Sequence, residues 1–265
     1  MKKILATVFA LMTISVFAQT FEGSIKWAIQ LNLSPAAQKQ IAELSSPENI
    51  AKMQAMFSSP QMKAMLEKNP EMKAAFEAMQ NGGNPFANLL PKAIASKVKA
   101  DKTYTNMEGG ITNGEYIFTP KENLKLNRLE KTYSAIPKSD ADEKNKPDVK
   151  VEKTTETSSI LGYTCTKYIV TMQEKGQNVT ANVWATNDVK GIDIKAMAKQ
   201  RAGKTSLFYE EIDGFPMRIE TVLPQDAGSA TVEVTELKNE SVADSYFVVP
   251  SEFKEVALSY GSLLK

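Results

Sequence analysis

The sequence contains no histidine and only one cysteine among its 265 residues. Without imidazole, a Ser-His-Asp triad, a Cys-His nucleophile pair and a histidine metal site are all excluded. Cys165 by itself can close no intramolecular disulfide and cannot build a thiolate zinc site, which needs several ligands. The 32 basic and 31 acidic side chains also leave no basic excess of the kind that marks nucleic-acid binding. These absences predict a protein that is not an enzyme and that uses no metal and no cofactor.

Long hydrophobic runs are also missing, with one exception at the start of the chain. Lys2 and Lys3 precede an apolar stretch from Ile4 to Leu11, which continues to a small-residue exit at Ala18. This pattern predicts a secretory signal peptide over residues 1–18. The stretch is shorter than the roughly 20 residues that span a bilayer, so it does not predict a membrane anchor. The residue directly after the expected cleavage point is Gln19 and not a cysteine, which argues against a lipoprotein.

We therefore expect residues 19–265 to be exported, periplasmic or secreted, and to form a single β-rich domain without a transmembrane segment. Cleavage after Ala18 removes two lysines, so the formal charge changes from +1 to −1 (1 − 2).

The clearest strand comes directly after this segment. Apolar residues alternate with polar or small ones from Phe21 to Leu33, which is the period-two pattern of a strand with one buried face. Ile25, Trp27 and Ile29 lie on the apolar side of this strand. They are expected to line either a packed core or a cavity.

A helical pattern follows between residues 34 and about 80. Ser34-Pro35, Ser46-Pro47, Ser59-Pro60 and Asn69-Pro70 each place a good N-cap before a proline at the first helical position. Apolar residues recur at helical spacing between these signals. The sequence therefore predicts three or four short helices within an insertion at about residues 34–91.

The sequence then returns to strand patterns. The predicted strands cover residues 94–108, 115–119, 123–129, 132–136, 149–157, 162–173, 178–185, 206–212, 217–223, 230–236 and 245–249, with a short helix near 192–201. The predicted fold class is α+β. It consists of one curved antiparallel β-sheet, a meander resembling a half-barrel, with a Met-rich helical insertion between the first two strands.

Methionine is concentrated in the predicted helices. Ten methionines remain after cleavage (twelve minus Met1 and Met12), and six of them lie between Met53 and Met79. They can form plain core, or an adaptable groove for an apolar ligand or peptide segment. Thioether pairs one helical turn apart, such as Met53 and Met56, leave copper(I) as a third interpretation.

The candidate ligand-binding residues come from the first strand and from this insertion. They are Ile25, Trp27, Ile29, Phe57, Met65, Met72, Phe76 and Met79. Cys165 falls in a predicted strand, where a buried inert thiol and intermolecular pairing are the two alternatives.

Several short motifs resemble an exported, uncharacterised family from Bacteroidetes that carries only a domain-of-unknown-function label. They lie at residues 20–27, 162–168, 183–186, 214–218, 242–247 and 250–253. The pattern is also similar to the LolA/LppX-like lipid carriers. That resemblance implies a curved antiparallel sheet around a hydrophobic cavity.

A second resemblance covers only residues 46–91. Asn69-Pro70-Glu71-Met72, with the flanking methionines, resembles the Met-rich repeats of Hsp70/Hsp90-organising co-chaperones and ubiquilins. Those repeats imply short helices around a groove for hydrophobic peptide segments. The expected function is therefore the binding of a lipid or acyl chain between sheet and helices, and the alternative is a chaperone-like interaction protein that holds hydrophobic client segments.

Overall fold

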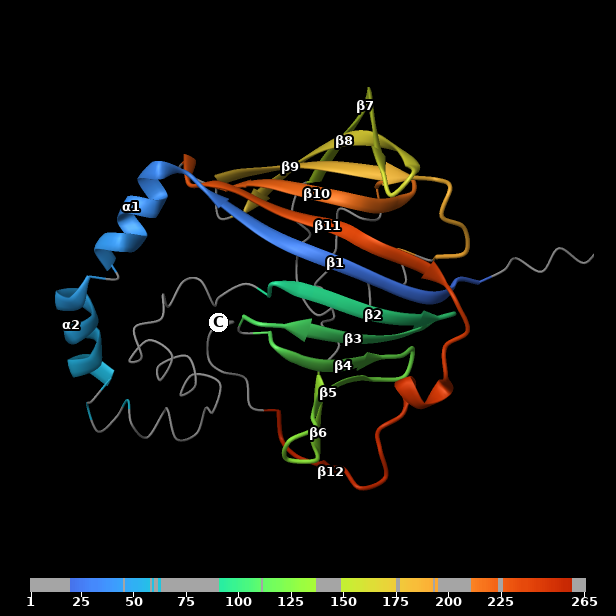
Figure 1. Cartoon of the computed structure of the whole chain (residues 1–265), viewed down its shortest axis with the longest axis horizontal. Coiled ribbons are helices and arrows are strands. Elements are labelled where there is room, and N and C mark those ends of the chain that lie inside the picture. The colour runs from blue at the N-terminus through green and yellow to red at the C-terminus, as the bar shows by residue number, and fades with distance from the viewer. Residues whose placement is uncertain are drawn as a thin grey trace, which may run out of the picture.

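The computed structural model describes residues 20–44, 46–57, 59, 62, 91–110, 112–136, 149–174, 177–192, 194, 211–223 and 226–258 (Figure 1). Its strands form one curved, twelve-stranded sheet in the order β12-β6-β5-β4-β3-β2-β1-β11-β10-β9-β8-β7. The strands are β1 (Glu22–Leu33), β2 (Ala93–Lys99), β3 (Lys102–Glu108), β4 (Gly114–Phe118), β5 (Asn123–Asn127), β6 (Thr132–Ile136), β7 (Val149–Ile160), β8 (Tyr163–Glu174), β9 (Gln177–Thr186), β10 (Phe215–Leu223), β11 (Gly228–Asn239) and β12 (Lys254–Glu255).

The topology joins two antiparallel meanders at β1. One runs outward from β1 through β2 to β6, and the other starts at the far edge with β7 and returns through β8 to β11. β11 then pairs antiparallel with β1, from Gly23 opposite Asn239 to Leu33 opposite Gly228. Among the described strands these pairs are antiparallel, and β12 alone pairs parallel, with β6. The sheet is therefore open, with β7 and β12 at its two edges.

This architecture confirms a predominantly antiparallel, strand-rich fold, but two of the predicted strands are wrong. The single strand predicted over residues 94–108 is divided into β2 and β3 by a turn at Ala100 and Asp101. Ala100 adopts a left-handed φ of 53°, for which the sequence offers no glycine signal. The strand predicted over 245–249 is instead a 3₁₀ helix, η4 (Asp244–Phe247). In this segment Phe247 is buried, and the ring centre of Tyr246 lies 5.3 Å from that of Tyr104 on β3. The segment therefore packs against the sheet through two rings instead of pairing in it.

Two helices follow β1, namely α1 (Pro35–Leu44) and α2 (Pro47–Phe57). The Ser34 hydroxyl accepts a hydrogen bond from the Ala37 amide at 3.1 Å, and the Ser46 hydroxyl accepts one from the Asn49 amide at 3.4 Å. The first two predicted caps are therefore confirmed. The rest of the predicted insertion, residues 58–90 except Ser59 and Met62, lies outside the described residues. So do residues 195–210, which contain most of the predicted helix near 192–201 and of the strand over 206–212.

The main core gathers where β1 begins. Its buried members include Phe21, Ile25 and Trp27 of the β1 segment, Val98 of β2, Met217 of β10 and Val234 of β11. Ile192 and Ile194, from the connection between β9 and β10, pack against it. A hydrogen bond from the Phe21 amide to the Gly191 carbonyl, at 2.9 Å, ties that connection to the start of β1.

The C-terminal segment covers part of the other meander. Val249 and Phe253 pack against a cluster formed by Ile117, Leu124 and Leu126 of β4 and β5. The Glu22 carboxylate accepts a hydrogen bond from the Val242 amide at 2.7 Å, which anchors the segment to the start of β1. The segment then ends at the β6 edge as β12.

Candidate functional site

The side of the sheet that carries Ile25, Trp27 and Ile29 is called here the apolar face. Residues directly opposite each other in antiparallel strands share a face, so the register extends this face across several strands. One row runs through Ile29, Val232, Ile219, Val183 and Tyr168. The next runs through Leu31, Ala230, Thr221, Ala181, Val170 and Val151. The apolar face is therefore continuous from β1 to the outer strands of the second meander.

Burial on the apolar face changes along β1. Ile25 is 0% exposed and Trp27 is 9% exposed, Ile29 is half-buried, and Leu31 is 40% exposed. The neighbouring strands show the same change, because their large apolar residues near Leu31 are also less than fully buried. We call the apolar patch the exposed Leu31 together with five partly buried side chains around it, of which Val232 and Ile219 also pack against core residues: Ile29 and Leu33 of β1, Val232 of β11, and Ile219 and Leu223 of β10.

The apolar patch ends where the chain enters α1 and α2. Leu33 is the last residue of β1, and Ser34 caps α1 immediately afterwards. On α2, Met56 is 57% exposed. A flexible, polarizable side chain is thus presented to solvent on one of the two described helices. Figure 1 shows α1 and α2 following on from this end of β1.

The predicted ligand-binding residues fall into four groups. Ile25 and Trp27 lie in the packed core, and Ile29 lies in the apolar patch. Phe57 is the last residue of α2, and its side chain is not among those the structure describes. Met65, Met72, Phe76 and Met79 lie outside the described residues. Sequence reasoning missed the patch residues on β10 and β11, although both strands carry alternating apolar residues.

The opposite face of the same strands carries a charged ladder that sequence reasoning also missed. Trp184 of β9 lies opposite Lys167 of β8 on one side and Arg218 of β10 on the other. The Lys167 ammonium is 5.8 Å and the Arg218 guanidinium carbon 5.4 Å from the centre of the indole ring. Both distances are within the range of cation–π attraction.

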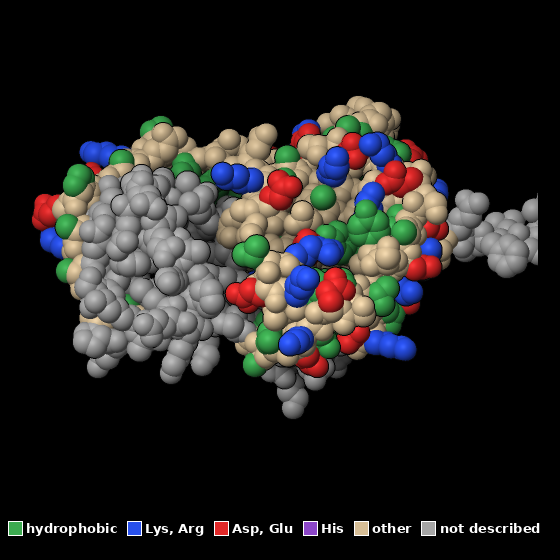
Figure 2. All heavy atoms as spheres, turned by 60° about the horizontal axis from the view of Figure 1, so that its bottom comes forward, with side chains coloured by type: hydrophobic (Ala, Val, Ile, Leu, Met, Phe, Trp, Pro, Cys, Tyr) green, Lys and Arg blue, Asp and Glu red, His purple; other side chains and the backbone are tan. Residues whose placement is uncertain are grey.

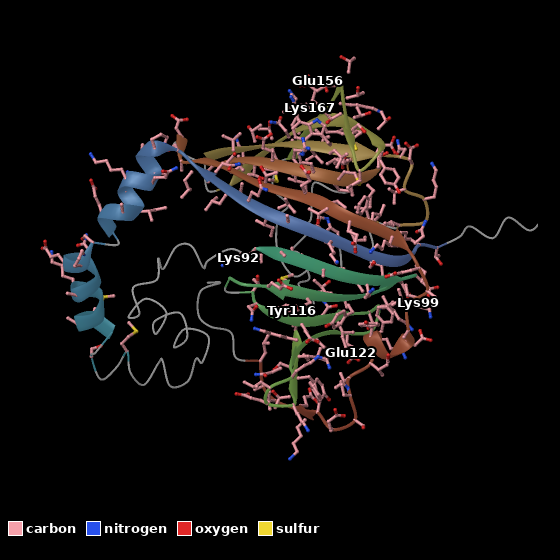
Figure 3. All side chains as sticks on the ribbon, in the orientation of Figure 1. Lys92, Lys99, Tyr116, Glu122, Glu156 and Lys167 are labelled. Carbon is pink, nitrogen blue, oxygen red and sulfur yellow. The ribbon has the colours of Figure 1, made fainter. Side chains whose placement is uncertain are left out.

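Each cation of the ladder also meets a carboxylate. The Lys167 ammonium lies 3.0 Å from a carboxylate oxygen of Glu156 on β7 (Figure 3). Arg218 forms an ion pair with Glu233 of β11. Both cations of the ladder therefore have a carboxylate partner on a neighbouring strand, as opposite charges in adjacent strands of an antiparallel sheet do.

Cys165 and Tyr104, elsewhere in the described chain, are ionisable side chains whose pKa is raised by burial in the fold. Burial raises the pKa of the Cys165 thiol, and this side chain is fully buried. Burial, assisted by Glu115, raises the pKa of Tyr104 to about 12. Within the described ranges, no three carboxylate or thiol groups gather as metal ligands would. Cys165 therefore takes the first of its two predicted roles, as a buried thiol.

The surface in Figure 2 carries basic and acidic side chains interspersed over its described part. This agrees with the near balance of charge in the sequence. Of the helices that the structure describes, none has the length and hydrophobicity needed to cross a membrane.

Comparison with known proteins gives a family without an assigned activity. The family described as "Domain of unknown function (DUF4412)" matches residues 94–253. Among solved structures, the chain is similar to an uncharacterized conserved protein from Thermus thermophilus, with 12% identity and a TM-score of 0.38. That similarity covers 63% of this chain and 80% of the other. No curated protein matches the chain.

Proposed function

The chain belongs to the family of the domain of unknown function DUF4412, and on the site alone we propose that it is an exported, non-catalytic protein that binds a hydrophobic ligand, a lipid or acyl chain, on its apolar patch. The observation that carries this proposal is the change of burial along one face of β1, from the fully buried Ile25 to the 40% exposed Leu31.

The apolar patch needs an explanation because its partly exposed side chains are contiguous. Single exposed apolar side chains are ordinary on protein surfaces, whereas clustered ones typically mark binding sites. Here Leu31, Val232 and Ile219 lie in neighbouring strands on the same face, so their side chains form one surface. Covering such a surface with a hydrophobic ligand contributes about 25 cal/mol per Å² buried, before the cost of ordering the ligand.

The Met-rich helices are the proposed cover of the bound ligand. Methionine side chains adapt to guests of varied shape, and Met56 is already exposed on α2. In this proposal Ile29 contacts the ligand from the sheet, Ile25 and Trp27 support it from below, and Phe57, Met65, Met72, Phe76 and Met79 contact it from the insertion.

The test compares two substitutions that differ in the face they alter. Leu31→Asp places a carboxylate in the apolar patch. Val222→Asp is the matched control, because Val222 is 47% exposed on β10 but lies opposite Ser229, on the other face. Lipid that copurifies with the mature chain is extracted into organic solvent and quantified by mass spectrometry. We expect the wild type and Val222→Asp to carry lipid and Leu31→Asp to lose most of it.

Unfolding by urea shows whether both variants remain folded with similar stability. Equal lipid content in both variants, or a wild type that carries no lipid, would refute binding at the apolar patch.

Export is tested separately by determining the N-terminus of the protein recovered outside the cytoplasm. Gln19 is expected as its first residue.

A chaperone-like interaction protein is the second candidate, and the exposure of Met56 favours it. Such a protein suppresses aggregation of an unfolded client and copurifies with no lipid. Under this alternative Met56→Ser weakens the suppression, whereas Leu31→Asp leaves it unchanged.

A further inference from the structure

The two edges of the sheet end in strands of different length, the two-residue β12 and the twelve-residue β7. At one edge β12 pairs with β6, whereas β7 is the last strand of the sheet at the other edge. β7 spans twelve residues, and its pairing with β8 is regular from Val149 to Lys153, where a bulge interrupts it. No other described strand pairs with the outer side of this regular stretch, so its outward backbone amides and carbonyls can pair with another strand.

Two charges on this stretch are not used within the sheet. Lys150 lies opposite Thr171 of β8, and Glu152 lies opposite Ile169. Both charged side chains are exposed, and neither has an ion-pair partner among the described residues. Lys26 and Arg218, in contrast, meet an opposite charge across the sheet, in Glu236 and Glu233 respectively.

We propose that β7 is a homodimerisation edge that pairs antiparallel with β7 of a second copy of this chain, about a two-fold axis at Val151. This axis places Lys150 opposite Glu152 of the second copy and Glu152 opposite its Lys150. Shifting the axis to Lys150, Glu152 or Lys153 places like charges opposite each other. Val151 then faces Val151 of the second copy, and the apolar face continues across the junction.

The test first reverses one charge and then exchanges both. Sedimentation velocity on the mature chain measures the dissociation constant of the dimer. Because of the two-fold axis, Lys150→Glu or Glu152→Lys each creates two like-charge pairs, and we expect either to weaken the dimer about tenfold or more. The double variant Lys150→Glu/Glu152→Lys restores opposite charges in the same register and is expected to recover the wild-type constant.

Lys121→Glu is the control, since Lys121 is an exposed turn residue outside the sheet and the substitution changes the net charge equally. It is expected to leave the constant unchanged, and added salt is expected to weaken the wild-type dimer. A wild type that stays monomeric up to about 1 mM overturns the proposal, as does a dimer that Lys150→Glu does not weaken or a double variant that fails to recover. Circular dichroism identifies any variant that fails to fold. In that case Lys150→Gln or Glu152→Gln, which removes both ion pairs without adding a like charge, is measured instead, and a dissociation constant equal to that of the wild type overturns the proposal.

Discussion

The ladder on the face opposite the apolar patch allows a quantitative prediction about stability. Trp184 lies between two cations, with Lys167 at 5.8 Å and Arg218 at 5.4 Å from its ring centre. Their side chains are 17% and 30% exposed, so both contacts are partly desolvated. At this degree of exposure each cation–π contact is worth about 1 kcal/mol. Trp184→Leu is therefore expected to lower the free energy of unfolding by about 2 kcal/mol through these contacts alone.

A double-mutant cycle separates the cation–π contact from the loss of ring packing. Combining Trp184→Leu with Lys167→Met is expected to give a coupling energy of about 1 kcal/mol in urea unfolding. The control cycle combines Trp184→Leu with Lys97→Met on β2, four strands away, or about 19 Å. Residues that far apart contribute additively, so its coupling is expected to be near zero. Equal coupling energies in the two cycles would show that the ring and the ammonium do not stabilise each other.

Three further outcomes follow from burial. Ile25→Ala is expected to lower the free energy of unfolding by about 2–5 kcal/mol, because Ile25 is fully buried; a loss as small as that from Ile29→Ala would contradict its place in the core. Cys165 is expected to react with a disulfide reagent only as fast as the protein unfolds, because its thiol is buried and its pKa is raised; immediate reaction in the native state would contradict this. The pKa of Tyr104 is raised to about 12, so its neutral form is favoured in the folded state. Its contribution to stability is present below about pH 10 and is lost between about pH 10 and pH 12, and an ultraviolet titration in which Tyr104→Phe removes no late-titrating tyrosine would disprove it.

Local sequence signals predicted the local structure well. The alternation from Phe21 to Leu33 gave β1 within one residue, because a strand with one buried face requires period two. Ser34 and Ser46 marked the starts of α1 and α2, because a hydroxyl before a proline satisfies the first free amides of a helix. These features depend only on residues close together in the chain.

Features set by long-range pairing could not be read from the sequence. Lys167, Trp184 and Arg218 come from three strands, and only the register of β8, β9 and β10 brings them together. The turn at Ala100 was missed because a residue other than glycine adopts the left-handed conformation there. Trp27 and Leu31 occupy equivalent positions in the alternating pattern of β1, and the sequence does not show that Trp27 is buried in the core while Leu31 is 40% exposed.

The different roles of the two ends of β1 follow from what lies against each end. Near its start, Phe21 bonds to Gly191, and the connection that contains Ile192 packs on the core around Ile25. Near its end, Leu31 is 40% exposed, and the strand leads into α1. One apolar face is thus divided between folding and the proposed binding. Ile25→Ala should therefore change stability in the absence of ligand, whereas Leu31→Asp should change lipid content at nearly constant stability. If both substitutions altered the same quantity, β1 would carry a single function, and its half-exposed end would be ordinary surface.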